Sequence, residues 1–232
     1  MDFSVIPLNL PYMLQGLGVT FFLAIVSMGA SLVSGTIFAM MRVSKIAAIR
    51  IPAGLFIDVM RTIPLIMVMF WFFFLIPLMT GQPVSALVAA LVALIVFNTS
   101  YMAEVIRAGL QSVHRTQSEA AYSSGLAYLQ TMWYIILPQA FRNMLPAIVN
   151  RLVALVMGTS LAYIIGVTEF FRAANNVNNR VYQSYLIYSF VAVVYFLCCY
   201  SLSLLGRHLE RRLDPAAQAA AKNLLPRGLG SA

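Results

Sequence analysis

Five stretches of mostly apolar residues recur along the chain, with polar or charged connections between them. They cover residues 16–41, 56–79, 84–102, 148–165 and 185–205. A helix needs roughly 20 mostly apolar residues to cross a hydrocarbon core of about 30 Å. None of the stretches alternates with period two, as a strand of a membrane barrel does. The pattern therefore predicts an all-α integral membrane protein, a bundle of about five transmembrane helices.

The composition agrees with a membrane protein. Of the residues, 61% are hydrophobic and 9% are charged, whereas a soluble domain carries about a quarter charged residues. The net charge of +8 first indicates nucleic acid, but the basic residues lie at the ends of the apolar stretches, as in membrane topology. We expect membrane lipid around the chain and no nucleic-acid partner. The first four residues lack a basic segment, so we expect no cleaved signal peptide.

Lysine and arginine positions predict the orientation in the membrane, because cytoplasmic loops carry more of them. Arg172 and Arg180 lie on one predicted side. Twelve others lie on the opposite side, namely Arg42, Lys45, Arg50, Arg107, Arg115, Arg142, Arg151, Arg207, Arg211, Arg212, Lys222 and Arg227. We therefore expect a multi-pass protein of the cytoplasmic (inner) membrane, with an extracytoplasmic N-terminal segment 1–15 and a cytoplasmic C-terminal tail 207–232.

The same orientation places a long loop, about residues 103–147, on the cytoplasmic face. Loops of this length within a compact bundle are usually functional. Thr116 to Glu119 fit a capping box at the start of a helix, and Gly125 is suited to end that helix with a left-handed residue. A second short helix is predicted for residues 128–136, and it should stop at Leu137-Pro138. An ordinary amphipathic connector would have the same local features.

Ionisable groups near the spans are candidates for function, because they are costly in a membrane. Asp58 and Arg61 are one helical turn apart, and so are Glu104 and Arg107. In both pairs, mutual neutralisation is the simpler interpretation. A proline in the second span, Pro64, removes a backbone hydrogen bond, and broken helices of this kind line transporter sites.

Hydroxyl and amide groups near the ends of two spans suit an amino acid's carboxylate and ammonium. Interhelical hydrogen bonding is the alternative role. The candidate substrate path consists of Arg61, Thr62, Asn98, Thr159 and Ser160. Two histidines and two adjacent cysteines have no ligand or catalytic partners in the sequence, so we expect no catalytic residue and no metal site.

The cytoplasmic loop resembles a known family. Glu119-Ala120-Ala121, then Gly125, then Ile135-Ile136-Leu137-Pro138 reproduce the EAA-x3-G-x9-I-x-L-P pattern of ABC importer permeases. Further segments extend the similarity to the polar amino acid permeases, namely 60–65, 101–109, 137–142, 159–161 and 209–212. Residues 63–68 followed by Trp71-Phe72 resemble the glutamate/aspartate branch.

The resemblance implies a type I ABC importer permease fold over residues 16–206. It also implies that the loop docks into a separate ATPase chain through Glu119, Ala120, Ala121, Gly125, Leu137 and Pro138. The chain has no P-loop sequence, so we expect it to bind no cofactor, with ATP and Mg²⁺ on the ATPase subunit. A second permease subunit, identical or homologous, and a periplasmic or surface solute-binding protein are the other implied partners.

One departure from the family affects the substrate. Many relatives carry Lys-Asp before the Thr-Ser-Leu segment, whereas this chain has Met157-Gly158. Loss of the acidic residue disfavours a cationic substrate. We expect a permease subunit for polar L-amino acids, with glutamate and aspartate as the leading substrates and no enzymatic activity of its own. The alternative is a stand-alone secondary amino acid transporter, for which five spans without an inverted repeat are a poor basis.

Overall fold

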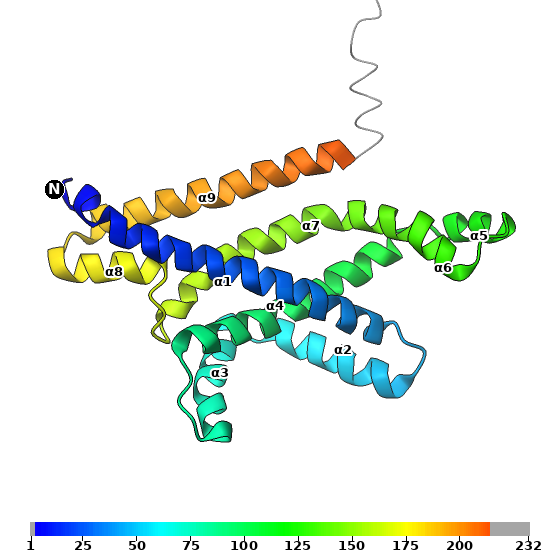
Figure 1. Ribbon diagram of the computed structural model, residues 1–232, viewed down its shortest axis with the longest axis horizontal. Helices are drawn as coiled ribbons and strands as arrows, with labels where there is room; N and C mark the ends of the chain where they lie inside the picture. The colour runs from blue at the N-terminus through cyan, green and yellow to red at the C-terminus, as the bar shows by residue number, and fades with distance from the viewer. Residues whose placement is uncertain (1–2, 214–232) are drawn as a thin grey trace, which may run out of the picture.

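The computed structural model describes residues 3–213, which form helices joined by short connections (Figure 1). Residues 214–232, including Lys222 and Arg227 of the predicted tail, lie outside the described part of the chain. The α-helices are α1 (Val5–Arg42), α2 (Ala47–Thr62), α3 (Leu65–Thr80), α4 (Ala86–Gln111), α5 (Arg115–Ser123), α6 (Tyr128–Thr131), α7 (Leu137–Gly158), α8 (Phe170–Val181) and α9 (Ser184–Leu213). A π-helical turn, Met132–Ile136, precedes α7, and a 3₁₀ segment, Thr159–Tyr163, follows it.

The helices confirm a bundle of about five spans. Within the described residues, four continuous helical segments are long and apolar enough to cross a membrane, and α2 with α3 would form a fifth span bent by 110°. The single predicted helix 56–79 is therefore wrong in its shape. Pro64 is the extended N-cap of α3, with ψ 139°. Because proline disfavours a helical conformation at the residue before it, Ile63 is extended too, and α2 ends there.

Helices α1 and α4 form the centre of the bundle, and small residues bring them together. A side chain at Gly35 would place its Cβ 2.8 Å from the Met102 Cβ, so only glycine permits this approach. The Ser34 and Thr99 hydroxyls are 2.6 Å apart between the same helices. In contrast, added Cβ atoms at Gly18 and Gly29 would meet nothing within 4 Å. The small residues of the first span therefore serve close packing on one face only.

Two helical segments were not predicted. Helix α1 begins at Val5, before the predicted start at residue 16, and it contains Pro11. Helix α8 lies in the connection between the last two spans. Its buried residues Phe170, Ala173, Ala174 and Val177 follow the i, i+3, i+4, i+7 spacing of an amphipathic helix. The spacing of an amphipathic helix was therefore present in the sequence. We had used the two arginines of this segment, Arg172 and Arg180, only to predict the orientation in the membrane.

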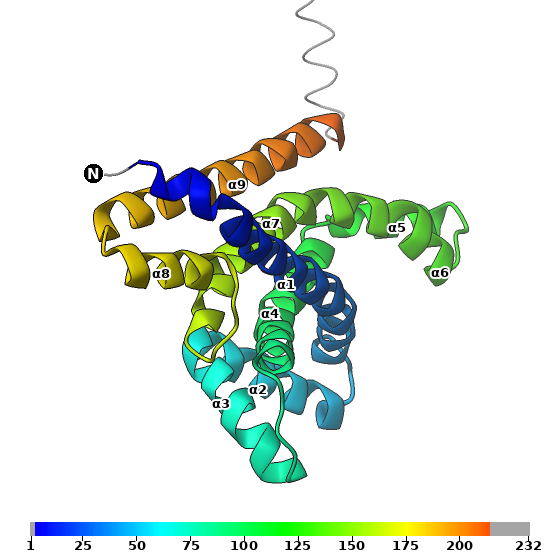
Figure 2. The ribbon, with the colours of Figure 1, turned by 60° about the vertical axis from the view of Figure 1, so that its left-hand side comes forward.

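The two ends of the bundle carry different structures (Figures 1 and 2). Helices α5 and α6 form a hairpin at the end where α4 finishes and α7 begins. The α1 N-terminus, α8 and the start of α9 gather at the opposite end. The hairpin and the short amphipathic helix α8 thus lie at opposite ends of the described structure.

Candidate functional site: a surface hairpin and a cationic cluster

Helix α5 of the hairpin begins earlier than the sequence indicated. His114 is its N-cap, in an extended conformation, and makes no side-chain cap hydrogen bond. Thr116 is already inside the first turn, where its hydroxyl lies 3.0 Å from the His114 Nδ1. The predicted capping box from Thr116 to Glu119 is therefore wrong, because the helix includes Arg115 and leaves Thr116 no N-cap geometry.

Gly125 forms the corner of the hairpin as predicted. Its φ is +82°, in the left-handed region. The Gly125 N–H donates to the Tyr122 carbonyl at 2.9 Å, and the Leu126 N–H donates to the Ala121 carbonyl at 3.1 Å. This pair of bonds is a Schellman motif, which satisfies the last carbonyls of a helix and requires a residue that tolerates positive φ.

The second short helix does not stop at Leu137-Pro138. Helical structure is continuous from Tyr128 to Tyr163, so the prediction of a break there is wrong. The Leu137 N–H donates to the Met132 carbonyl, five residues back. This wider π-helical turn comes just before Pro138, which lies in the first turn of α7, where a proline is tolerated. The chain therefore enters the membrane span without a loop.

The hairpin leaves several aromatic and aliphatic side chains exposed within the described part of the chain. The exposed set is Tyr122, Tyr128, Leu129, Trp133 and Tyr134. Glu119 and Ala120 are also exposed, Ala121 is buried, and Leu137 is half-buried. Two side-chain bonds hold the hairpin region to α7: Asn143 Nδ2 donates to Ser112 Oγ at 2.8 Å, and Gln139 Nε2 donates to Gln117 Oε1 at 3.5 Å. Apolar surface of this kind marks a protein contact.

A second cluster, of charged side chains, joins α1, α2 and α4 near the same end. Glu104 bonds Arg107 one turn along α4, as the sequence predicted. Its other carboxylate oxygen lies 3.7 Å from Arg61 Nη1 and 3.9 Å from Arg42 Nη1. Asp58 pairs with Arg42 at 2.9 Å. The expected Asp58–Arg61 pair is therefore wrong: Arg61 approaches Glu104 of α4, and Asp58 reaches across to α1.

Arg151 occupies a place that sequence reasoning missed. It was counted among the charges flanking a span, but it lies well inside the long helix that contains α7. Its Nε and Nη2 donate to Asn98 Oδ1 at 3.3 and 2.9 Å. The Asn98 amide in turn donates to Ser31 Oγ at 2.6 Å. The signal available in the sequence was an arginine within an apolar run, which is rare unless it has a function.

One aromatic ring connects Arg151 with Arg61. The guanidinium carbon of Arg151 is 4.0 Å from the centroid of the Tyr101 ring, and that of Arg61 is 5.5 Å away. The Tyr101 hydroxyl donates to the Arg61 carbonyl at 3.3 Å. The structure thus brings together Asn98 and Arg61 of the predicted substrate path, with Tyr101 and Arg151 as additional members. We call Arg61, Asn98, Tyr101 and Arg151 the cationic site.

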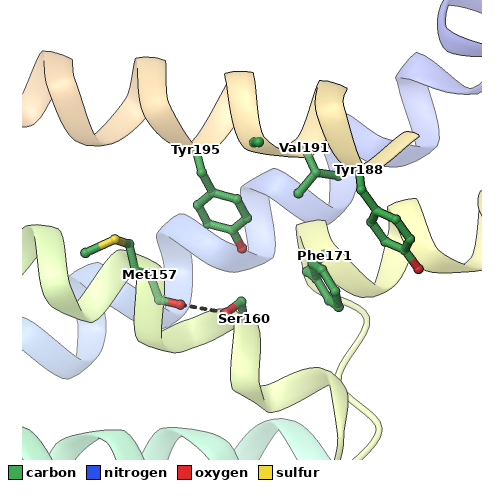
Figure 3. A pocket seen from close by; sticks show the side chains of 7 residues that line it. Met157, Ser160, Phe171, Tyr188, Val191 and Tyr195 are labelled. Carbon is green, nitrogen blue, oxygen red and sulfur yellow. Dashed lines mark hydrogen bonds between the residues drawn. The ribbon is translucent and has the colours of Figure 1, made fainter. Parts of the chain in front are cut away.

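The other predicted path residues lie elsewhere. Thr62, at the end of α2, donates to the Val59 carbonyl at 2.8 Å. Thr159 is buried and donates to Val156, and Ser160 donates to Met157, each at 2.7 Å. Ser160 also lines an open pocket of about 550 Å³ between α7, α8 and α9 (Figure 3). Figure 3 shows aromatic and aliphatic side chains around this pocket, which suits an apolar occupant better than an amino acid's charges.

A buried carboxyl, Glu169, holds the opposite end of the bundle together. It accepts bonds from the backbone N–H groups of Phe171 and Arg172, both at 2.8 Å, and thereby caps α8. The Tyr195 hydroxyl lies 3.3 Å from the same carboxyl. Burial raises the pKa of Glu169 from 4.5 to about 7, although its hydrogen bonds oppose that increase. This residue has a structural role distant from the cationic site.

Comparisons with known proteins agree with this architecture. The family described as "binding-protein-dependent transport system inner membrane component" matches residues 31–215. The chain is 37% identical over 218 residues to the glutamate/aspartate import permease protein GltK of Escherichia coli O6:H1, covering 91% of this chain and 97% of that one. It is 36% identical over 207 residues to the probable glutamine ABC transporter permease protein GlnP of Bacillus subtilis, covering 88% and 94%.

Solved structures show the same fold. The crystal structure of an amino acid ABC transporter with histidines has a chain with TM-score 0.86 and 30% identity, covering 91% of this chain and 99% of that chain. An inward-facing structure of the MetNI methionine ABC transporter has TM-score 0.71 at 19% identity, covering 92% of this chain and 100% of that one. The second similarity concerns the fold alone.

Proposed function

Because the chain belongs to the family of binding-protein-dependent transport system inner membrane components, we propose that it imports glutamate and aspartate. It is a multi-pass inner-membrane permease of the amino-acid ABC transporter type. We infer an acidic substrate from the 37% identity to a glutamate/aspartate import permease over nearly the whole chain. The excess of arginine over carboxylate around Glu104 supports it.

The family implies an ATPase and a solute-binding protein as partners. In our proposal the α5–α6 hairpin docks into a separate ATPase chain, which binds ATP and Mg²⁺, while this chain performs no catalysis. The exposed Trp133 and Tyr134 and the Gly125 corner support this role. A second permease subunit, identical or homologous, completes the membrane pathway.

The hairpin end is proposed to face the cytoplasm, with the N-terminus outside and the C-terminus inside. The distribution of basic residues supports this orientation. Arg42, Arg107, Arg115 and Arg142 lie at or near the hairpin end, whereas α8 at the other end carries Arg172 and Arg180. The same arrangement places the ATPase docking surface where ATP is available.

The test is reconstitution of the complete importer. The chain is co-expressed and purified with a candidate ATPase, a second permease subunit and a solute-binding protein, and placed in proteoliposomes with ATP on the ATPase side. We expect the binding protein loaded with glutamate or aspartate to stimulate ATP hydrolysis and uptake, and loading with lysine to have little effect. A nucleotide analogue that cannot be hydrolysed is the control. Uptake that persists with the analogue would favour the secondary transporter instead.

A further inference from the structure

We propose that Arg151, held by Asn98 and stacked on Tyr101, binds a carboxylate of the amino acid as it crosses the membrane, with Arg61 reinforcing the site. This proposal rests on the proposed function and specifies which side chains of the path recognise the substrate.

Arg151 lies away from both ends of its span. Asn98, to which it is bonded, lies at the middle of the α4 span Ala86–Gln111. A guanidinium always carries its charge, and at such depth the charge is costly unless an anion or a water-filled path accompanies it. Arg151 lies in the span formed by the continuous helix Tyr128–Tyr163. Arginines near the end of a span can extend their charged group to the membrane surface. Arg151 lies away from the span ends and so differs from these arginines.

The partners that the structure gives Arg151 are uncharged. Among residues 3–213, Arg151 makes no ion pair; its partners are the neutral Asn98 amide and the Tyr101 ring. Its Nε and Nη2 both use one oxygen, and Nη1 makes no hydrogen bond within those residues. The side chain is half-buried, so part of it remains accessible. A carboxylate is the group whose two oxygens match the remaining donors of an arginine.

Two neighbours hold the Arg151 guanidinium in one orientation. Asn98 is fully buried and fixed on its far side by Ser31, so it holds the guanidinium from one edge. The Tyr101 ring contacts the guanidinium face. An arginine fixed at one edge and one face is pre-organised for a ligand at its open edge, which reduces the entropic cost of binding.

The charge of the surroundings indicates the substrate class. Asp58 and Glu104 are shared among Arg42, Arg61 and Arg107, and Arg151 adds a further positive charge. An amino acid with a net negative charge offsets this excess, whereas a cationic one increases it. The site therefore favours acidic amino acids over neutral ones, and neutral ones over basic ones.

The experiment uses the complete importer in proteoliposomes and compares Arg151→Gln with the wild type. A hydrogen bond to a charged group supports roughly tenfold to hundredfold tighter binding, so uptake of glutamate and aspartate should fall by about that factor. Arg151→Lys should retain an intermediate rate, since it keeps the charge but not the paired donors. The matched control is Arg50→Gln, an exposed arginine at the start of α2, which should transport like the wild type.

Glutamine and asparagine distinguish the two carboxylates of the substrate. If Arg151→Gln affects acidic amino acids alone, the site binds the side-chain carboxylate; an equal loss for the amides identifies the α-carboxylate. Unchanged uptake of all four by Arg151→Gln overturns the proposal. Loss of the second permease subunit from the purified Arg151→Gln complex also overturns the proposal. That result would mean that Arg151 pairs with a carboxylate of the second subunit and not with the substrate. A wild-type complex that moves no amino acid refutes the proposed function itself, before any variant is compared.

Discussion

The corner at Gly125 allows a substitution whose cost is confined to the backbone. With φ at +82°, an L-residue other than glycine is strained there, and an added Cβ would meet no atom within 4 Å. Left-handed geometry costs about 1–2 kcal/mol for an ordinary side chain, which changes the population of the native corner by roughly 5- to 30-fold. Gly125→Ala should show this cost, and Gly125→Val should exceed it because its branched Cβ is more restricted.

The corner holds two backbone hydrogen bonds, to the Ala121 and Tyr122 carbonyls. If the strained residue relaxes to a right-handed conformation, both bonds are lost and α6 leaves its present angle to α5. Each bond is worth about 0.5–1.5 kcal/mol, comparable with the strain, so the corner should be displaced in a large share of the molecules. The spans should still form and insert, because the hairpin lies at the end of the bundle.

The assay measures two quantities at matched membrane expression: the amount of ATPase that co-purifies and the rate of uptake. We expect both to fall in the order glycine, alanine, valine. Gly125→Asn should stay close to the wild type, because asparagine tolerates the left-handed region. The control is Gly18→Val, at a helical glycine whose added Cβ meets nothing within 4 Å. Strain at the corner is refuted as the cause if Gly125→Val has no effect, or if Gly125→Asn is as harmful as Gly125→Val.

Three further outcomes are expected. In a cysteine-free background, an impermeant thiol reagent applied to intact cells should label Asn179→Cys but not Thr116→Cys; the reverse pattern would invert the proposed topology. Gly109→Ala should destabilise the protein by about 1–3 kcal/mol, because its Cβ would lie 1.9 Å from the Met144 Cγ; thermal unfolding should show partial recovery with Met144→Ala, and no recovery would contradict a steric cause. The pKa of Glu169, about 7 when folded against 4.5 ordinarily, means that stability should fall as pH rises from about 4.5 to about 7; unfolding temperatures of Glu169→Gln should lack this slope, and an identical slope would exclude Glu169 as its source.

The spans and the hairpin corner could be predicted because they depend on local properties of the sequence. Apolar length determines where a helix can cross a membrane, and a glycine after a short helix indicates a left-handed corner. Both rules use only residues that are near one another in the sequence. The type of structure at Gly125 was therefore correct from the sequence, although the helix before it starts two residues earlier than its polar residues indicated.

The partners of charged residues on other helices could not be predicted in the same way, because they depend on how the helices pack. Asp58 and Arg61 are close in sequence, but packing directs them to Arg42 and Glu104 on other helices. Arg151 was placed at a span border because the helix was expected to begin near residue 148. The π-helical turn before Pro138 instead allows the helix to continue from the hairpin, and this moves Arg151 into the interior of a span.

The continuous helix from Tyr128 to Tyr163 makes the hairpin and the cationic site parts of one lever. At 1.5 Å per residue, Arg151 lies about 35 Å along it from Tyr128. A tilt of about 5° at the hairpin would then displace the guanidinium by about 3 Å, enough to break its bond to Asn98. A partner that rocks the hairpin could thus release a bound carboxylate without touching the membrane interior. The π-helical turn Met132–Ile136 is the point at which this long helix would bend first. Its stiffness would therefore determine how much of a tilt at the hairpin is transmitted to Arg151.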